Sequence, residues 1–327
     1  MSTVYESIGS FPFDKPLLRV QRDEALLLAP PLPSNKKRHR DHPPITAVHF
    51  PTGYVEQAFS HPRDVYRSEF ARVEWQTMHD SRQAFYHRNT GADEISYEVH
   101  GRRYLLTDLG TVIMEPGEFV RLPNGVAHDN YGIEDIHVLF YLPGPAIEQL
   151  PALRTSEFME SQFDGWVAGQ VNELVSEGLG GPGTDIVLFP ADERLLLEHA
   201  KHTGERLPVL RPAASARGTT WLYRSAAFLL GLTRDDRSAG TEYQRHLDAD
   251  EVHYQLKGRR TLVTQRGTIQ LEPGDFVKIP RGVAFTSIHG ALSEHITLIS
   301  MHELQQVPER SKQGEPIDAA ALARLRA

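Results

Sequence analysis

The sequence predicts an all-β protein built of two similar antiparallel barrels, and two observations support this prediction. Short segments rich in β-branched and aromatic residues alternate with turn residues from about 46 to 143 and again from about 219 to 301. This spacing of short strands is typical of a sandwich or barrel. The segment that begins at Tyr86 also recurs at Tyr243, with its glycines, prolines and one Glu kept at the same offset. Such a repeat indicates that one scaffold is present twice.

The 327 residues divide into five expected regions, a length that suits two domains. Residues 1–45 are rich in Pro and predict an extended N-terminal arm, because Pro disfavours long helices and central strands. An N-terminal barrel (46–145) and a C-terminal barrel (206–305) are joined by a connector (146–205). The last region, 306–327, predicts a short amphipathic helix.

The connector is expected to be helical. Apolar residues are spaced three and four apart in 157–163 and in 166–175, which is the helical pattern. The Gly-rich stretch 178–183 then ends this run, and 191–200 predicts a second short helix. We therefore expect two barrels joined by helices.

The composition limits the class of protein. A hydrophobic content of 40% with 24% charged residues is that of a soluble globular chain, and a net charge of -8 argues against nucleic acid or an anionic membrane as partner. No cysteine is present, so disulfides and thiolate metal sites are excluded. No apolar run is long enough for a membrane span and no signal peptide is recognisable. We expect a cytoplasmic protein in which the basic run 36–40 is a solvated loop.

Candidate metal ligands lie in the first copy of the repeat. His87 and Asn89 are two residues apart, so in a strand both side chains point to the same face. His128 follows the turns at 116–117 and 123–125, which direct its strand to the opposite wall. Two imidazoles, a carboxylate and an amide oxygen around one point suit a divalent ion, and a set of two His and one carboxylate is typical of non-haem Fe(II).

The motif pattern of the repeat is that of the cupins, which are small jelly-roll barrels. Glu is the usual acid of the cupin motif, so Glu94 is favoured as the carboxylate ligand. The spacing alone leaves Asp93 open as an alternative, because the two acids are adjacent and the motif tolerates either.

The second copy differs at the ligand positions. Gln244 replaces the first His, His246 replaces the Asn, and Phe285 replaces the last His. His246 and Glu251 remain, and His253 or His289 would have to complete a second site. We expect this barrel to have lost its metal and to support a dimer or an interdomain surface.

Other polar residues near the motifs favour structural roles. Arg88 lies between two candidate ligands, so its side chain should point out of the pocket and form salt bridges. Arg103 recurs as Arg260 at the same turn, which favours a structural role in both copies. His137 alternates with apolar neighbours, as a core histidine with satisfied hydrogen bonds does.

The motifs around Tyr86–Glu94 and Glu272–Ala284 resemble the two-barrel ring-cleaving dioxygenases, which include homogentisate 1,2-dioxygenase and the large subunit of hydroquinone 1,2-dioxygenase. The resemblance covers roughly 80–143 and 238–301. It implies a non-haem Fe(II) enzyme that binds a 1,4-dihydroxybenzene and O2 and cleaves the ring beside one hydroxyl. The implied iron ligands are His87, Asn89, Glu94 and His128. Those families keep their iron in the C-terminal barrel, whereas the candidate ligands here lie in the N-terminal one.

The expected partners are a small aromatic substrate and O2. Exposed strand edges need cover, so we expect a homodimer or a heteromer with a second dioxygenase subunit. Two other functions stay open: a Mn- or Zn-dependent cupin isomerase, lyase or hydrolase acting on a small oxygenated acid, and a non-catalytic bicupin subunit.

Overall fold

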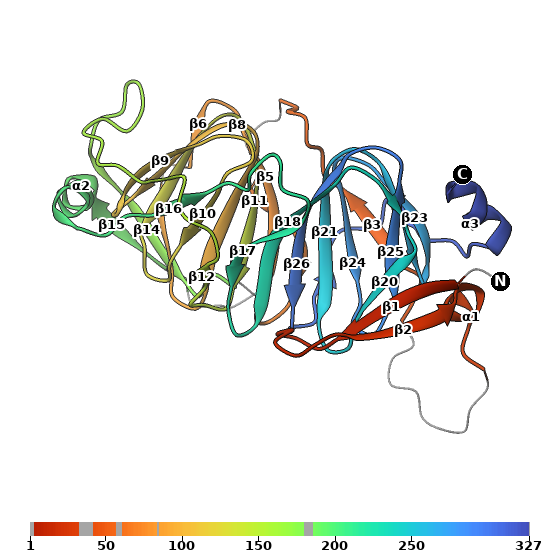
Figure 1. Cartoon of the computed structure of the whole chain (residues 1–327). Helices are drawn as coiled ribbons and strands as arrows, with labels where there is room; N and C mark the ends of the chain where they lie inside the picture. The colour runs from red at the N-terminus through yellow and green to blue at the C-terminus, as the bar shows by residue number, and fades with distance from the viewer. Residues whose placement is uncertain (1–2, 33–41, 57–60, 84, 180–185, 327) are drawn as a thin grey trace.

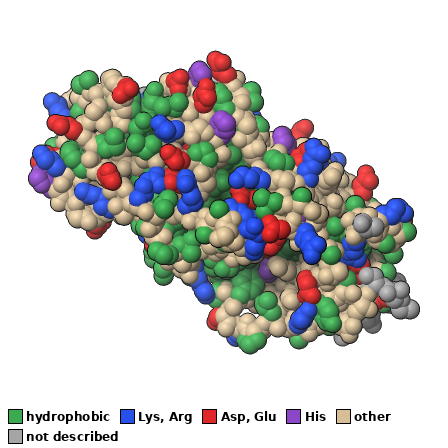
Figure 2. Space-filling view, turned by 45° about the horizontal axis from the view of Figure 1, so that its top comes forward, with side chains coloured by type: hydrophobic (Ala, Val, Ile, Leu, Met, Phe, Trp, Pro, Cys, Tyr) green, Lys and Arg blue, Asp and Glu red, His purple; other side chains and the backbone are tan. Residues whose placement is uncertain are grey.

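The computed structural model describes residues 3–32, 42–56, 61–83, 85–179 and 186–326, and it consists of two antiparallel β-barrels that lie side by side (Figure 1). The predicted all-β class is therefore confirmed. The basic run 36–40 lies outside the described residues. Positive and negative side chains are interspersed over the face seen in Figure 2.

One sheet of 13 strands forms the N-terminal barrel, and its longest strands, β8 and β11, pair along most of their length. Its strands are β4 (Arg63–Arg67), β5 (Arg72–Met78), β6 (Ser81–Arg82), β7 (Phe85–Asn89), β8 (Asp93–Thr107), β9 (Gly110–Met114), β10 (Phe119–Leu122), β11 (His128–Leu142), β13 (Arg154–Thr155), β14 (Gln170–Ser176), β15 (Val187–Asp192), β16 (Pro208–Leu210) and β27 (Gln305–Gln306).

Two sheets form the C-terminal barrel. The first holds β1 (Thr3–Gly9), β2 (Leu18–Asp23), β19 (Ser238–Ala239), β20 (Glu242–His246), β22 (Arg260–Thr264), β23 (Gly267–Leu271) and β25 (Phe285–His289). The second holds β3 (Thr46–His49), β12 (Ile147–Glu148), β17 (Gly218–Arg224), β18 (Phe228–Asp235), β21 (Asp250–Lys257), β24 (Asp275–Ile279), β26 (Ser293–Ser300) and β28 (Lys312–Gln313). Three helices complete the described chain: α1 (Glu24–Leu28), α2 (Glu193–His202) and α3 (Ala319–Arg326).

The two barrels exchange strands across the expected boundaries. Strand β3 pairs with β24 of the C-terminal barrel, although it lies in the region expected to begin the N-terminal one. Strand β27 pairs with β4, and β16 pairs with β10, so these late segments join the N-terminal barrel. The boundaries at 46 and 206 therefore differ from the strand pairing, because each barrel is completed by a segment from the other half of the chain.

The expected helices at 157–163 and 166–175 are wrong. The first stretch contains no helix, and much of the second is the strand β14, which pairs in parallel with β7 and antiparallel with β15. Pairing with the edge of β7 satisfies the backbone of β14, and such tertiary context overrides a short helical pattern. The helix predicted at 191–200 is present as α2, capped by the Asp192 side chain, which accepts a hydrogen bond from the Arg194 amide.

The largest apolar core lies between the barrels. Trp75 of β5 and Phe140 of β11 pack in one cluster with Leu230 of β18 and Tyr254 of β21. Because successive strand residues point to opposite faces, the alternate residues of these strands face the barrel interiors. Those residues include Glu74 and other buried polar side chains. One face of these strands thus packs against the other barrel, and the opposite face lines the barrel interior with polar side chains, where the candidate site lies.

Candidate metal centre

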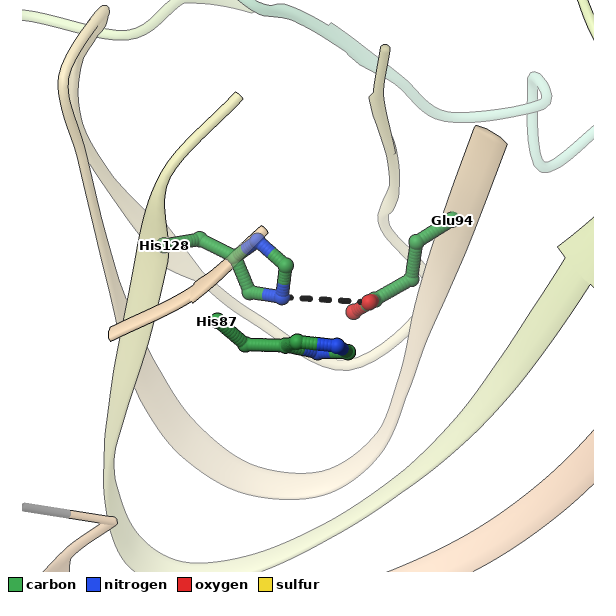
Figure 3. Close-up of side chains that lie close together, drawn as sticks. All are labelled: His87, Glu94 and His128. Atoms are coloured by element: carbon green, nitrogen blue, oxygen red, sulfur yellow. Dashed lines mark ion pairs between the residues drawn. The ribbon is translucent and has the colours of Figure 1, made fainter. Parts of the chain in front are cut away.

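Three candidate ligands converge inside the N-terminal barrel (Figure 3). His87 of β7 lies directly opposite His128 of β11 in the strand register, and their ring centroids are 5.2 Å apart. Glu94, the second residue of β8, places Oε2 3.1 Å from Nε2 of His128. One ligand atom from each residue lies within 4.8 Å of the others. Within the described part of the chain this is the only group of three or more His, Asp or Glu ligand atoms that meets this criterion.

Burial sets the protonation of this group. Burial, together with the neighbouring His128, lowers the pKa of His87 to about 4, so this imidazole is neutral at neutral pH. Burial opposes ionisation of Glu94, but attraction to His128 outweighs it and the pKa of Glu94 falls to about 2. Burial likewise disfavours protonation of His128, yet the Glu94 carboxylate raises the pKa of His128 above its ordinary value. A divalent ion bound here would meet one neutral imidazole, one carboxylate and one imidazole that keeps its proton to a higher pH than usual.

The adjacent acids Asp93 and Glu94 have different surroundings. The Asp93 carboxylate accepts hydrogen bonds from the backbone amides of Asn124 (3.0 Å) and Ala146 (2.8 Å) and pairs with Arg121 at 3.2 Å. It therefore holds two loops and does not join the imidazoles. The structure brings Glu94 to the two His residues, as the sequence analysis favoured.

Asn89 lies beside the group as a hydrogen-bond donor. Its amide Nδ2 donates to Oε2 of Glu94 at 3.1 Å, and its Oδ1 is buried with no hydrogen-bond partner in the ranges described. In this orientation Asn89 positions the Glu94 carboxylate through its amide nitrogen, and its own Oδ1 points away from that carboxylate. A rotation of the amide would bring Oδ1 to the ligands, because a cation favours the oxygen end of an amide.

Strand β14 supplies a residue that the sequence analysis missed. The Ser176 hydroxyl lies 2.9 Å from Nε2 of His87, and the Ser176 carbonyl accepts the backbone amide of Thr90. Two residues on, Gly178 has a φ of +82°, and a Cβ there would lie 2.6 Å from Oδ1 of Asn89. Glycine is therefore required for this close approach. The helical pattern assigned to this region concealed these contacts.

A second polar group lines the same interior. Arg72 lies 3.2 Å from Glu74 through its Nε and sits over the ring of Tyr141, 4.2 Å from the centroid. Tyr141 lies directly opposite Glu94 in the register of β11 and β8. Burial raises the pKa of Glu74 to about 8, and Arg72 only partly offsets this. Glu74 therefore holds a proton at neutral pH, and no sequence motif marked it.

The C-terminal barrel repeats the geometry without the ligands. Gln244 lies opposite Phe285 in the register that pairs His87 with His128 in the other barrel. The ring nitrogens Nε2 of His246 and His253 each lie 2.5 Å from a different oxygen of Glu251. The carboxylate is thus engaged by two imidazoles, and the ring of Phe285 occupies the third position.

The other residues singled out in the sequence have structural partners. Arg88 donates to Glu173 at 2.7 Å and to Asp108 at 3.1 Å, so the predicted salt bridges are confirmed. His137 is fully buried between Asp135 (2.8 Å) and Gln76 (3.2 Å), which confirms a satisfied core histidine.

The duplicated arginines hold equivalent contacts. Arg260 donates to His253 (2.9 Å) and to Ser287 (2.7 Å), and Arg103 donates to Ser96 (2.5 Å) and approaches Asn130 (3.5 Å), which are the corresponding positions of the first copy. The repeated arginine therefore braces the same strands in both barrels.

The class of the molecule follows from these features. Two jelly-roll barrels carry the same turns and motifs, and each directs an imidazole and a glutamate to its interior, so the fold is that of a bicupin. Among the helices of the described chain, none has the length and apolar character that crossing a membrane requires.

Comparisons with known proteins give similarity at the level of fold. No family model and no curated protein matches the chain. Similar solved structures include a Cupin 2 conserved barrel domain protein from Leptotrichia buccalis, with 6% identity and a TM-score of 0.46 over 75% of this chain and 92% of that chain. Oxalate decarboxylase from Bacillus subtilis has 9% identity and a TM-score of 0.46 over 82% and 80%. The protein Ylba from E. coli has 11% identity and a TM-score of 0.44 over 83% and 97%. Similarity this distant carries no argument about activity.

Proposed function

We propose that the N-terminal barrel binds a divalent metal ion through His87, Glu94 and His128, and that the chain is a non-haem Fe(II)-dependent dioxygenase that cleaves a dihydroxylated aromatic ring. The observation that carries the proposal is the convergence of these three side chains within 4.8 Å. Two imidazoles and one carboxylate leave coordination positions open, which is the donor set typical of non-haem Fe(II).

The protonation of the ligands fits a divalent ion. One carboxylate and two neutral imidazoles leave a net charge of about +1 around a dication, so a monoanionic phenolate would bring the centre near neutrality. Bound Fe(II) would supply Lewis acidity toward a phenol oxygen and electrons for the reaction with O2.

The chain's own residues would orient the ligands and hold protons. Asn89 fixes one oxygen of Glu94 through a 3.1 Å hydrogen bond, and Ser176 contacts Nε2 of His87 at 2.9 Å. Such outer contacts fix ligand orientation and typically change metal affinity 10- to 100-fold when they are lost. Glu74, protonated at neutral pH, is placed to give a proton within the same interior.

Metal analysis and oxygen uptake test the proposal. Protein purified without oxygen should contain about one Fe per chain, or take it up when Fe(II) is added, and then consume O2 with hydroquinone or a ring-substituted hydroquinone. His128→Ala should lose both properties. The matched control is His246→Ala in the C-terminal barrel, which should keep both. Absence of O2 uptake with a panel of para-diphenols would reject the dioxygenase.

A second candidate function uses the same residues without O2. The site offers a carboxylate and a nearby amide oxygen, donors that also suit Mn(II). A Mn-dependent lyase or isomerase on a small oxygenated acid is therefore the alternative. Tight Mn binding without O2 consumption would favour it, and failure to bind any of these ions would favour a non-catalytic subunit.

A further inference from the structure

The interior of the C-terminal barrel contains a cavity of about 220 Å³ at the level where the other barrel holds its candidate ligands. Its walls are dense in hydroxyl groups. These come from Thr219, Thr233, Ser238, Thr286, Ser287 and Ser293. The Thr233 hydroxyl lies between two others, 2.8 Å from that of Thr219 and 2.6 Å from that of Thr297. A cavity lined in this way offers many groups that both donate and accept hydrogen bonds.

His295 points to a ligand in this cavity. It lines the wall, the residue is 7% exposed, and its Nδ1 has no hydrogen-bond partner within the described ranges of the chain. A buried polar atom without a partner destabilises the fold, and such atoms are rare in native structures. Because burial also lowers the pKa of His295 well below its ordinary value, the ring is neutral. The described residues give Nδ1 no partner, so a ligand that reaches the ring from the cavity would supply one.

Fixed donors and acceptors surround the same space. Arg260 is braced by Gln255, Ser287 and His253 at 2.7 to 2.9 Å. A guanidinium has five N–H groups, so N–H groups remain to serve a ligand beyond these three bonds. His289 contacts the Ala291 carbonyl through Nδ1 at 2.8 Å, which leaves its Nε2 as an acceptor.

The charge of the lining disfavours an anion. Three carboxylates, those of Asp235, Glu242 and Glu251, line the cavity together with one arginine, Arg260. Burial raises the pKa of Glu251, but attraction to His253 and hydrogen bonds with His246 and His253 outweigh it and hold this pKa far below its ordinary value, so the carboxylate is ionised. An added negative charge would be repelled, whereas neutral hydroxyl groups can bond to carboxylate, imidazole and guanidinium alike.

The cavity adjoins a larger one. A space of about 470 Å³ shares Thr219, Glu242, Gln244 and Glu251 with it and is also lined by Trp221. An aromatic wall beside a polar cavity suits the C–H face of a saturated ring. The two spaces together have room for a ring and a substituent.

We propose that the C-terminal barrel binds a small neutral polyhydroxylated compound, such as a monosaccharide or a cyclitol, without a metal ion. Hydroxyl groups of the ligand would donate to His295 and Glu251 and accept from Arg260. This site is distinct from the metal centre of the proposed function, and neither inference depends on the other.

Ligand-detected NMR and calorimetry with D-glucose, D-xylose and myo-inositol, on full-length protein treated with chelator, test the proposal. At least one of the three should bind saturably, with Kd of about 10 mM or tighter. His295→Leu should weaken binding about 10-fold or more, the effect expected for loss of a buried hydrogen bond. Ser287→Ala provides an independent second variant in case His295→Leu does not fold, as judged by near-ultraviolet circular dichroism.

His128→Ala is the control that separates the two sites, because it should abolish metal binding and leave polyol binding unchanged. Binding that disappears on chelation or in His128→Ala would overturn the proposal, because the compound would then belong to the metal centre. Lack of saturable binding by all three compounds, or binding of phenols or carboxylic acids in their place, would also overturn it. Loss of O2 uptake alone would leave the polyol result intact.

Discussion

Replacement of Glu94 by Gln removes the negative charge that raises the pKa of His128 in the metal-free protein. Glu94 Oε2 lies 3.1 Å from His128 Nε2, and both side chains are about 2% exposed. At an effective dielectric constant of about 20, two unit charges at this separation attract by about 5 kcal/mol, which is an upper limit because burial penalises both. One pKa unit corresponds to about 1.4 kcal/mol. Loss of this attraction should therefore lower the pKa of His128 in Glu94→Gln, because the Glu94 carboxylate is the main group that raises it.

The stability of the metal-free protein should change in a defined pH range. The raised pKa of His128 contributes stability that is complete below the ordinary value of 6.5 and is lost as the pH rises through the folded value. The lowered pKa of Glu94 contributes stability that is complete above the ordinary value of 4.5 and is lost as the pH falls toward about 2. Both contributions are complete between about pH 4.5 and 6.5, so Glu94→Gln should cost most there.

Histidine ring signals followed by NMR between pH 4 and 9 in chelator-treated protein measure the His128 pKa directly, and urea unfolding across the same range measures the stability. Glu251→Gln is the matched control, because it removes the corresponding carboxylate of the other barrel and should leave the His128 titration unchanged. A His128 pKa in Glu94→Gln equal to or above that of the unaltered protein would refute the electrostatic reasoning.

Three further predictions concern metal binding. Because His128 must lose its proton, metal affinity should fall about tenfold per pH unit below the pKa of His128, and calorimetry in two buffers should detect one released proton. Gly178→Ala should weaken the metal at least 10-fold and destabilise the fold by about 1–3 kcal/mol, because the left-handed backbone and the 2.6 Å approach to Asn89 Oδ1 admit no Cβ. The double substitution Gln244→His with Phe285→His should raise the metal content from one to two per chain, since these positions pair in the register of the existing imidazoles.

Each of these predictions has a contrary result. Metal affinity that does not vary between pH 5 and 8 would contradict proton displacement from His128. Gly178→Ala that binds metal normally would show that Asn89 does not need its present position, and Gly125→Ala is the control, because nothing lies within 4 Å of a Cβ there although its φ is +91°. The third prediction would be wrong if the folded double variant still bound one metal ion per chain.

The all-β fold was predictable because its signals are local. Strand length, turn residues and the repeat lie in the sequence itself, and together they indicate two barrels without any long-range information. The convergence of His87, Glu94 and His128 was expected from the motif, and the structure brings these three side chains together.

Features that depend on tertiary pairing were not predictable. Val171 and Leu174 follow a helical spacing, yet the free edge of β7 recruits this segment as β14. That pairing places Ser176 beside His87, a contact that no sequence motif indicates. Spacing also could not choose between Asp93 and Glu94, because the choice depends on which face of β8 turns inward, and backbone amides elsewhere in the fold capture Asp93.

The position of the largest apolar cluster has a consequence for how such a protein diversifies. Residues such as Trp75, Phe140 and Tyr254 pack the two barrels against each other, so much of the apolar burial that stabilises the fold lies outside the two barrel interiors. Side chains that face the interior of either barrel can therefore be replaced while the barrel itself stays folded. The duplicated scaffold therefore supports two interiors of different chemistry: one holds the pair His87 and His128, and the other holds Gln244 and Phe285 at the matching positions.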